Sequence, residues 1–162
     1  MKGVLSMTQS QIGYMVGNEK LLGIIGPLWE ELNVYHKNLS TYFKQEYEVL
    51  SFAQRQIMFL EKAAEGLLRI EIADNLDQKM LIGYSISSIG KRSQGEIESI
   101  FVKADYRGQG IGDHFMKTAL GWMDDLETRV KNVHVASGNE IAFSFYARYG
   151  FLPRQTILKQ RN

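Results

Sequence analysis

Apolar positions along the chain follow two periods, one typical of helices and one typical of strands. Over residues 21–37, aliphatic and aromatic side chains recur every three or four positions, which predicts an amphipathic helix with Asn18 as its N-cap. Pro27 falls inside this stretch and is expected to kink or divide the helix. The same spacing returns over residues 52–65 and stops at Gly66, which predicts a second helix.

Strand-like segments dominate the rest of the chain. Strands are expected over residues 8–16, 67–73, 80–89, 96–102, 130–136 and 154–159. Turns at 74–77 and 90–95 would close two hairpins, and a further helix is expected over 111–126. Because the strands come first as hairpins and later alternate with helices, we expect an α/β fold with a mixed sheet and helices on both faces.

Composition narrows the class of protein. The 162 residues are 44% apolar and 23% charged, as expected for one domain spanning 1–162. The net charge of +1 does not favour nucleic-acid binding, and the absence of cysteine excludes disulfides, thiolate metal sites and acyl-cysteine intermediates. No apolar run reaches membrane-spanning length and the N-terminus lacks a signal pattern, so we expect a cytoplasmic protein with no membrane partner.

A glycine-rich turn carries the first functional signal. Residues 107–112 read Arg-Gly-Gln-Gly-Ile-Gly between the expected strand at 96–102 and the expected helix at 111–126. Such a turn leaves backbone N–H groups unpaired at the positive end of a helix dipole, which suits a phosphate. Asp113 stands where a dinucleotide fingerprint needs a small residue, and no Gly-Lys-Ser/Thr follows, so neither of those motifs fits. An ordinary glycine-rich turn remains the alternative for this hexapeptide alone.

A second motif lies about thirty residues downstream. Asn139 is expected to cap a short helix, Gly150 to end it in the left-handed conformation, and Ala142, Phe145, Tyr146 and Tyr149 to share one face. Taken with Arg107-x-x-Gly110-x-Gly112, this Asn-x-x-Ala-x-x-Phe-Tyr-x-x-x-Gly-Phe pattern resembles the GNAT superfamily of acetyl-CoA-dependent N-acetyltransferases. The match covers roughly residues 80–155, and the first eighty residues agree only in general layout.

The resemblance implies a mostly antiparallel sheet whose strands at 96–102 and 130–136 are parallel and splay apart around acetyl-CoA. Backbone groups near Phe101 and Val102 would bind the pantetheine arm, and an amide near Val102 would polarise the thioester carbonyl. The implied cofactor-binding residues are Phe101, Val102, Arg107, Gly108, Gln109, Gly110, Ile111, Gly112, Asn139, Ala142, Phe145 and Tyr146. For Phe145, simple core packing is at least as good an explanation.

The implied chemistry is transfer of an acetyl group to a primary amine. Freeing the lone pair of an amine with a pKa near 10.4 costs about 4–5 kcal/mol at pH 7, so a proton acceptor is needed. Glu98 is the candidate base, although it could equally be a solvated carboxylate on a strand. By resemblance, the Tyr146 hydroxyl donates a proton to the departing thiolate. Without cysteine, direct transfer in a ternary complex is expected.

The acceptor is the least determined part of the site. The resemblance places an acceptor pocket on the first helices, where Trp29, Glu30 and Tyr35 are candidates together with Glu98. The three histidines are scattered without metal-ligand spacing, so no metal is expected. Two alternatives to the enzyme stay open: a catalytically inactive CoA-binding sensor or interaction module, and a purely structural domain. A homodimer through the C-terminal strands is implied by the resemblance alone.

Overall fold

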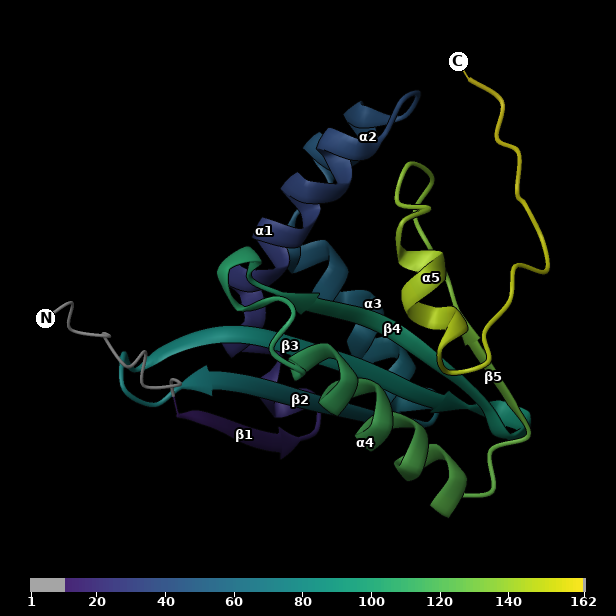
Figure 1. Ribbon diagram of the computed structural model, residues 1–162. Coiled ribbons are helices and arrows are strands. Elements are labelled where there is room, and N and C mark those ends of the chain that lie inside the picture. Colours follow the sequence, from purple (N-terminus) through teal and green to yellow (C-terminus); the bar gives the residue numbers. More distant parts are fainter. Residues whose placement is uncertain (1–10, 162) are drawn as a thin grey trace, which may run out of the picture.

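The computed structural model describes residues 11–161, in which a five-stranded sheet carries helices on both faces (Figure 1). The strands lie side by side in chain order: β1 (Ile12–Gly17), β2 (Leu67–Asn75), β3 (Met80–Gly90), β4 (Gln94–Val102) and β5 (Val130–Val133). The first four are antiparallel and only β4 and β5 are parallel, which confirms the predicted mixed sheet. The expected strand at 8–16 begins in residues 8–10, outside the described part of the chain.

Two helices cover one face of the sheet and one long helix covers the other. α1 (Leu22–Leu39) and α3 (Phe52–Glu65) pack on β2 and β3 through a cluster that includes Ile25, Phe59 and Tyr84. α4 (Ile111–Asp125) lies across the opposite face, where Phe115 and Met116 are fully buried. The short helix α5 (Ala142–Ala147) joins the α4 side through Tyr146. No helix within residues 11–161 has the length and apolarity that crossing a bilayer demands.

Local side-chain bonds explain where the first helices begin. The Asn18 side chain accepts a hydrogen bond from the Lys20 amide, which caps the 3₁₀ turn Glu19–Leu21 leading into α1. α3 begins with a capping box in which Ser51 and Gln54 bond each other's backbone amides, and it ends at Gly66 as predicted. Pro27 neither ends nor divides α1, which runs unbroken for 18 residues.

The structure corrects three expectations for the C-terminal third. β5 stops at Val133 rather than at residue 136, and α5 has Ile141 as its N-cap, with no capping bond from the Asn139 side chain. Residues 154–159 form no strand, because they run beside no partner and instead reach α2 (Lys44–Val49), where the Lys159 ammonium contacts the Glu46 carboxylate at 2.6 Å. Gly150 is left-handed as expected, and the Phe151 amide bonds the Tyr146 carbonyl to close the helix end.

A bulge in β4 sets which side chains face α3. Ile86 of β3 pairs with Ser99 and the next residue, Ser87, pairs with Ile97, so Glu98 is an extra residue in β4. The alternation of side chains along β4 therefore shifts at this point. Glu96 and Glu98 share one face by ordinary alternation, and the bulge adds Ser99, so all three contact groups on the face that carries α1 and α3.

Candidate functional site

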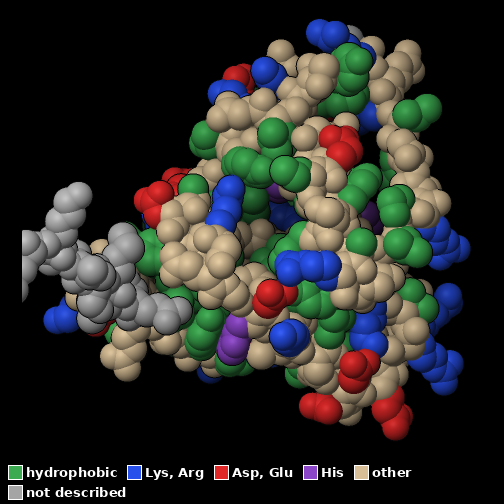
Figure 2. All heavy atoms as spheres, viewed as in Figure 1, with side chains coloured by type: hydrophobic (Ala, Val, Ile, Leu, Met, Phe, Trp, Pro, Cys, Tyr) green, Lys and Arg blue, Asp and Glu red, His purple; other side chains and the backbone are tan. Residues whose placement is uncertain are grey.

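The parallel pair of strands is short, and the cavity begins where it ends. β4 and β5 pair only from Gln94–Val130 to Ile97–Val133. β4 then continues to Val102 with no strand on that side, and a cavity of about 500 Å³ opens between it and residues 133–136. The visible surface is hollowed between the parts formed by α1 and α5 (Figure 2). The cavity lies where the sequence places the splayed strands.

The unpaired half of β4 offers backbone hydrogen-bonding groups to this cavity. The Lys103 amide donates to the Ile82 carbonyl of β3, so the Phe101 backbone also points toward β3 by the alternation of an antiparallel ladder. The backbone groups of Ile100 and Val102 therefore point the other way, into the gap. Both residues line the cavity. Val102 was expected from the resemblance and Ile100 was not, because which amides are free depends on the register with β3.

The glycine-rich turn forms one end of the cavity. Gly108 and Gly110 have φ angles of +76° and +85°, which other residues rarely adopt, and a Cβ at either position would meet open space. Gly110 is the N-cap of α4 and no side chain caps that helix. The first amides of α4 therefore have no partner within the helix and no capping side chain. This uncapped helix start, open on the cavity side, fits a diphosphate group.

Arg107 ties the turn to α1 rather than standing free at the rim. Its Nε atom donates to the Val102 carbonyl at 2.9 Å, and its guanidinium lies 5.2 Å from the centre of the Tyr35 ring. Both Arg107 and Tyr35 line the cavity. Gln109 does not, since its side chain donates to the Asp105 carbonyl instead.

The far wall of the cavity comes from α5 and the loop before it. It is formed by four residues named from the sequence motif: Asn139, Ala142, Phe145 and Tyr146. The Phe145 ring lies 3.2 Å from the position of a Cβ on Gly112, so the ring would have to move by a few tenths of an ångström to admit a side chain there. Tyr146 is 9% exposed, and no group in residues 11–161 hydrogen-bonds its hydroxyl. Burial raises the pKa of Tyr146 to about 12, so the phenol is protonated at neutral pH.

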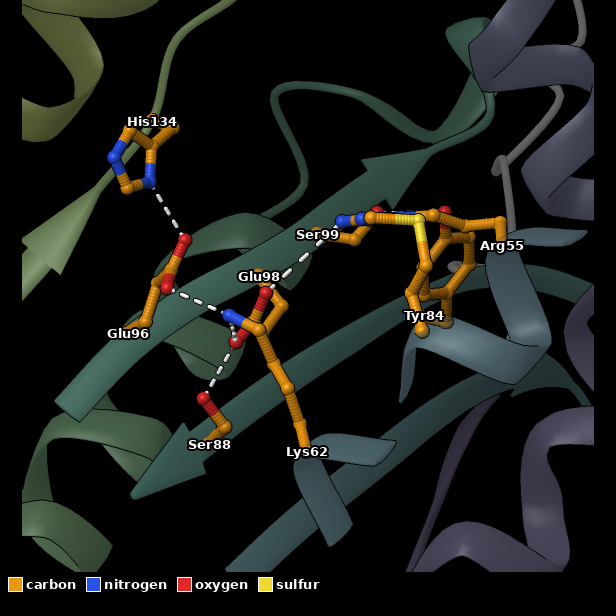
Figure 3. Close-up of polar contacts among 9 residues, drawn as sticks. Arg55, Lys62, Tyr84, Ser88, Glu96, Glu98, Ser99 and His134 are labelled. Atoms are coloured by element: carbon orange, nitrogen blue, oxygen red, sulfur yellow. Dashed lines mark hydrogen bonds and ion pairs between the residues drawn. The ribbon is translucent and has the colours of Figure 1, made fainter. Parts of the chain in front are cut away.

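Glu98, the candidate base, is enclosed by partners (Figure 3). One carboxylate oxygen accepts a hydrogen bond from Ser88 at 2.5 Å and pairs with the Lys62 ammonium of α3. The other lies 4.0 Å from the Arg55 guanidinium. The Glu98 side chain is only 1% exposed, although the residue lines the cavity. These distant partners could not be identified from the sequence.

Glu96 links the same cluster to His134. Its carboxylate accepts from Lys62 at 2.8 Å and lies 2.6 Å from Nδ1 of His134, which follows β5 (Figure 3). Burial alone would raise the pKa of Glu96, but the bonds from Lys62 and His134 lower it below its ordinary value. His134 lines the cavity and its side chain is 76% exposed. Nothing in the sequence assigned a role to His134.

Only two of the four expected acceptor residues line the cavity. Tyr35 and Glu98 line the cavity, together with two further residues of α1. These are His36, which lies in the stretch expected to shape the acceptor pocket, and Leu32, which was expected only as an apolar helix position. Trp29 is 5% exposed and packs against Phe52 in the core, so it does not line the cavity. Glu30 does not line this cavity but a second, neighbouring groove, which shares Tyr35 and Arg107 with it. Residues 11–161 contain no cluster of three or more acidic or histidine side chains suited to a metal ion.

Comparison with known proteins gives concordant results. Residues 29–151 match the Acetyltransferase (GNAT) family. Over 72 residues, or 44% of this chain, the sequence is 36% identical to an uncharacterised N-acetyltransferase of Methanocaldococcus jannaschii, and that match spans about a third (32%) of the curated relative's length.

Two solved structures share the fold. A GCN5-related N-acetyltransferase from Ralstonia eutropha has a TM-score of 0.72 at 14% identity, covering 93% of this chain and 99% of that one. The PaiA N-acetyltransferase of Thermoplasma acidophilum, in complex with coenzyme A, has a TM-score of 0.70 at 17% identity, covering 91% of this chain and 93% of that one. At these identities the likeness shows the fold alone.

Proposed function

Because the chain belongs to the Acetyltransferase (GNAT) family, we propose that it transfers the acetyl group of acetyl-CoA directly to a primary amine. One observation carries the proposal: an unpaired strand edge and an uncapped helix start meet in a single cavity. The first offers the Ile100 and Val102 amides and the Ile100 carbonyl to an extended amide-bearing chain, the Val102 carbonyl being bonded to Arg107. The second offers amides to a diphosphate. Acetyl-CoA carries both groups in sequence.

The chain's own residues supply the remaining needs of acyl transfer. The amides of Ile100 or Val102 polarise a thioester carbonyl held against β4, because a donor fixed in advance stabilises developing negative charge. Tyr146, protonated at neutral pH and without a hydrogen-bond partner among the described residues, gives a proton to the leaving thiolate. Tyr35 and His36 line the α1 side of the cavity, where the acceptor enters in this proposal.

Two measurements on the purified chain test this function. Calorimetry with acetyl-CoA reports binding, and release of free CoA thiol in the presence of amines reports transfer. The amine panel is spermidine, kanamycin, L-lysine amide and a short peptide with a free N-terminus. We expect saturable acetyl-CoA binding and amine-dependent thiol release. Binding without release would support the inactive sensor, and no binding would leave only a structural domain.

A further inference from the structure

We propose that Nε2 of His134 is the atom that takes the proton from the acceptor amine, with Glu96 as the residue that positions it. The inference rests on the proposed function and assigns the proton acceptor within it. It differs from the sequence-based expectation, in which Glu98 is the base. Glu98 and His134 line the cavity, and the Glu96 carboxylate contacts His134 (Figure 3).

His134 has the geometry of an oriented base. It follows the last paired residue of β5, Val133, at the point where the strands diverge. Its Nδ1 atom lies 2.6 Å from Oε1 of Glu96. An ionised carboxylate can only accept, so Nδ1 carries the proton and the lone pair of the neutral ring is on Nε2. With its side chain largely exposed and lining the cavity, His134 leaves that lone pair open to an amine.

Glu96 is held in place for this role. Lys62 donates to its other oxygen at 2.8 Å, so the carboxylate is fixed between α3 and β5. The bonds that Glu96 receives keep it ionised at neutral pH. A fixed negative charge beside Nδ1 stabilises the imidazolium that forms when Nε2 takes a proton. The pair thus supplies both orientation and a charge for the protonated state.

Glu98 is less suited to receive the proton. Its side chain is almost wholly buried, Ser88 and Lys62 bond one oxygen, and Arg55 approaches the other. A proton taken there would have to displace these contacts. Glu98 instead balances the charge of Lys62 and Arg55, which makes it a positioning residue in this proposal.

Other titratable groups reach the cavity from every surrounding element. α1 contributes His36, whose pKa is lowered by burial and which has no carboxylate partner among the described residues. α5 contributes Tyr146, which stays protonated. β4 contributes Glu98, and α3 contributes Lys62 and Arg55 behind it. α4 contributes Asp113, whose carboxylate lies 3.3 Å from the Arg148 guanidinium. Within residues 11–161, His134 alone combines an exposed lone pair at the cavity with a carboxylate on its second nitrogen.

The transfer balances as follows. The acceptor ammonium gives one proton to Nε2 of His134, and its nitrogen then attacks the acetyl carbonyl. The C–N bond forms, the C–S bond breaks, and the thiolate sulfur takes the Tyr146 proton. The second proton that the nitrogen loses returns to Tyr146, and the imidazolium releases its proton to solvent. The products are the acetylated amine, free CoA thiol and one proton.

Steady-state kinetics of four variants test the assignment, using the panel amine with the highest turnover. His134→Gln should lower kcat/KM at pH 7 by about 100-fold or more and remove the ascending limb of its pH profile. The loss should shrink as the pH approaches the pKa of the amine, where no base is needed. Glu96→Gln should shift the ascending limb to lower pH, because the imidazolium loses its carboxylate. Glu98→Gln should retain the ascending limb. The control is Lys131→Gln, on β5 and outside the cavity lining, which should have the kcat/KM and pH profile of the parent.

A measurement without an acceptor gives an independent result. The ¹⁵N resonances of the neutral His134 ring, assigned by their loss in His134→Gln, should show the proton on Nδ1 in the parent and less of that tautomer in Glu96→Gln. Equal tautomer populations would overturn the pair. The assignment also falls if His134→Gln keeps activity within twofold at all pH values while Glu98→Gln loses the limb. A parent protein that binds acetyl-CoA but turns over no amine overturns the proposed transfer, and the base assignment with it.

Discussion

The carboxylate of Glu71 on β2 contacts the His114 imidazole on α4, with 2.8 Å between Oε1 and Nε2. The two residues are 43 positions apart in the sequence. The His114 amide in turn bonds the carbonyl of Gly110, the N-cap of α4, and the Tyr14 ring of β1 stacks on the imidazole at 3.7 Å. The sheet thereby anchors the start of α4 beside the glycine-rich turn, on the opposite side from the cluster around Glu98.

Replacing Glu71 with glutamine should lower the free energy of unfolding at pH 7 by about 3 kcal/mol, because the largely buried Arg69 guanidinium loses the charge that it is paired with. Burial alone would raise the pKa of Glu71, but hydrogen bonds from Thr118, Arg69 and His114 lower it below its ordinary value. A lowered pKa means that ionised Glu71 stabilises the fold above the unfolded-state pKa, near 4.3, and that this is lost at lower pH. Urea unfolding from pH 3 to 7 should therefore show the two proteins converging in acid.

The matched control for that variant is Glu65→Gln. Glu65 forms an exposed ion pair with Lys91 at 3.8 Å, which should contribute less than about 1 kcal/mol. Equal destabilisation by both substitutions at pH 7 would contradict a special role for the buried carboxylate.

Replacing Gly110 with aspartate should weaken acetyl-CoA binding at least tenfold in calorimetry. The left-handed backbone disfavours any side chain, and a carboxylate at the helix start repels a diphosphate. Gly110→Ala separates the two effects, since it strains the turn without adding charge, and it should bind better than the aspartate variant. Gly121→Ala in α4, where a Cβ meets nothing, should bind as the parent does. If the aspartate variant bound acetyl-CoA as tightly as the parent, the glycine-rich turn would not be part of the binding site.

Replacing Tyr146 with phenylalanine should lower kcat by about 10- to 100-fold and leave the acetyl-CoA dissociation constant within twofold. Because the hydroxyl has no hydrogen-bond partner among the described residues, the melting temperature should hardly change. Thiol-release assays give kcat, and calorimetry on the same preparation gives the acetyl-CoA dissociation constant. A variant with parental kcat would show that the thiolate obtains its proton elsewhere.

The pH profile of the parent gives a second view of Tyr146. With a pKa raised to about 12 by burial, the phenol keeps its proton across the usual assay range. The rate should therefore show no descending limb from this residue below about pH 10. A limb near pH 8 or 9 that vanishes in Tyr146→Phe would contradict the effect of burial described above.

Replacing Gly138 with alanine should destabilise the fold by about 2 kcal/mol. Gly138 has a φ of +94°, and a Cβ there would lie 2.2 Å from the Leu39 carbonyl oxygen at the end of α1. Gly23→Ala is the control: it lies within α1 with open space around a Cβ, and should stabilise by about 0.5–1 kcal/mol. Denaturant unfolding measures both changes. If Gly138→Ala had the same free energy of unfolding as the parent, the loop would be able to move away from the added Cβ at little cost.

Much of the fold follows from local signals that the sequence displays. α3 begins and ends at the predicted residues because a serine–glutamine box and a glycine mark its two ends. Pro27 misled, because a proline six positions into a helix costs one hydrogen bond while burial of Ile25, Leu28 and Trp29 holds α1 together. The prediction of a strand at 154–159 was wrong for another reason: residues with strand propensity form no strand unless another strand pairs with them.

The site was predictable where it is built from backbone and only partly where it depends on side-chain pairing. The turn at 107–112 and the α5 motif each indicate their position in the cavity wall through glycine and aromatic spacing. Ile100 was missed because the free amides depend on register, and His134 because its partner Glu96 lies 38 residues earlier. The bulge at Glu98, which no residue type announces, adds Ser99 to the face that already carries both glutamates.

The four-pair ladder between β4 and β5 leaves the sheet one strand short over half its length. An extended ligand that binds beside Ile100 and Val102 takes the place of the missing strand. Ligand binding and folding are therefore thermodynamically linked. A ligand at one hundred times its dissociation constant would add about 2.7 kcal/mol to the unfolding free energy. The protein is thus expected to resist heat and proteases best when its donor is bound and least when the cavity is empty.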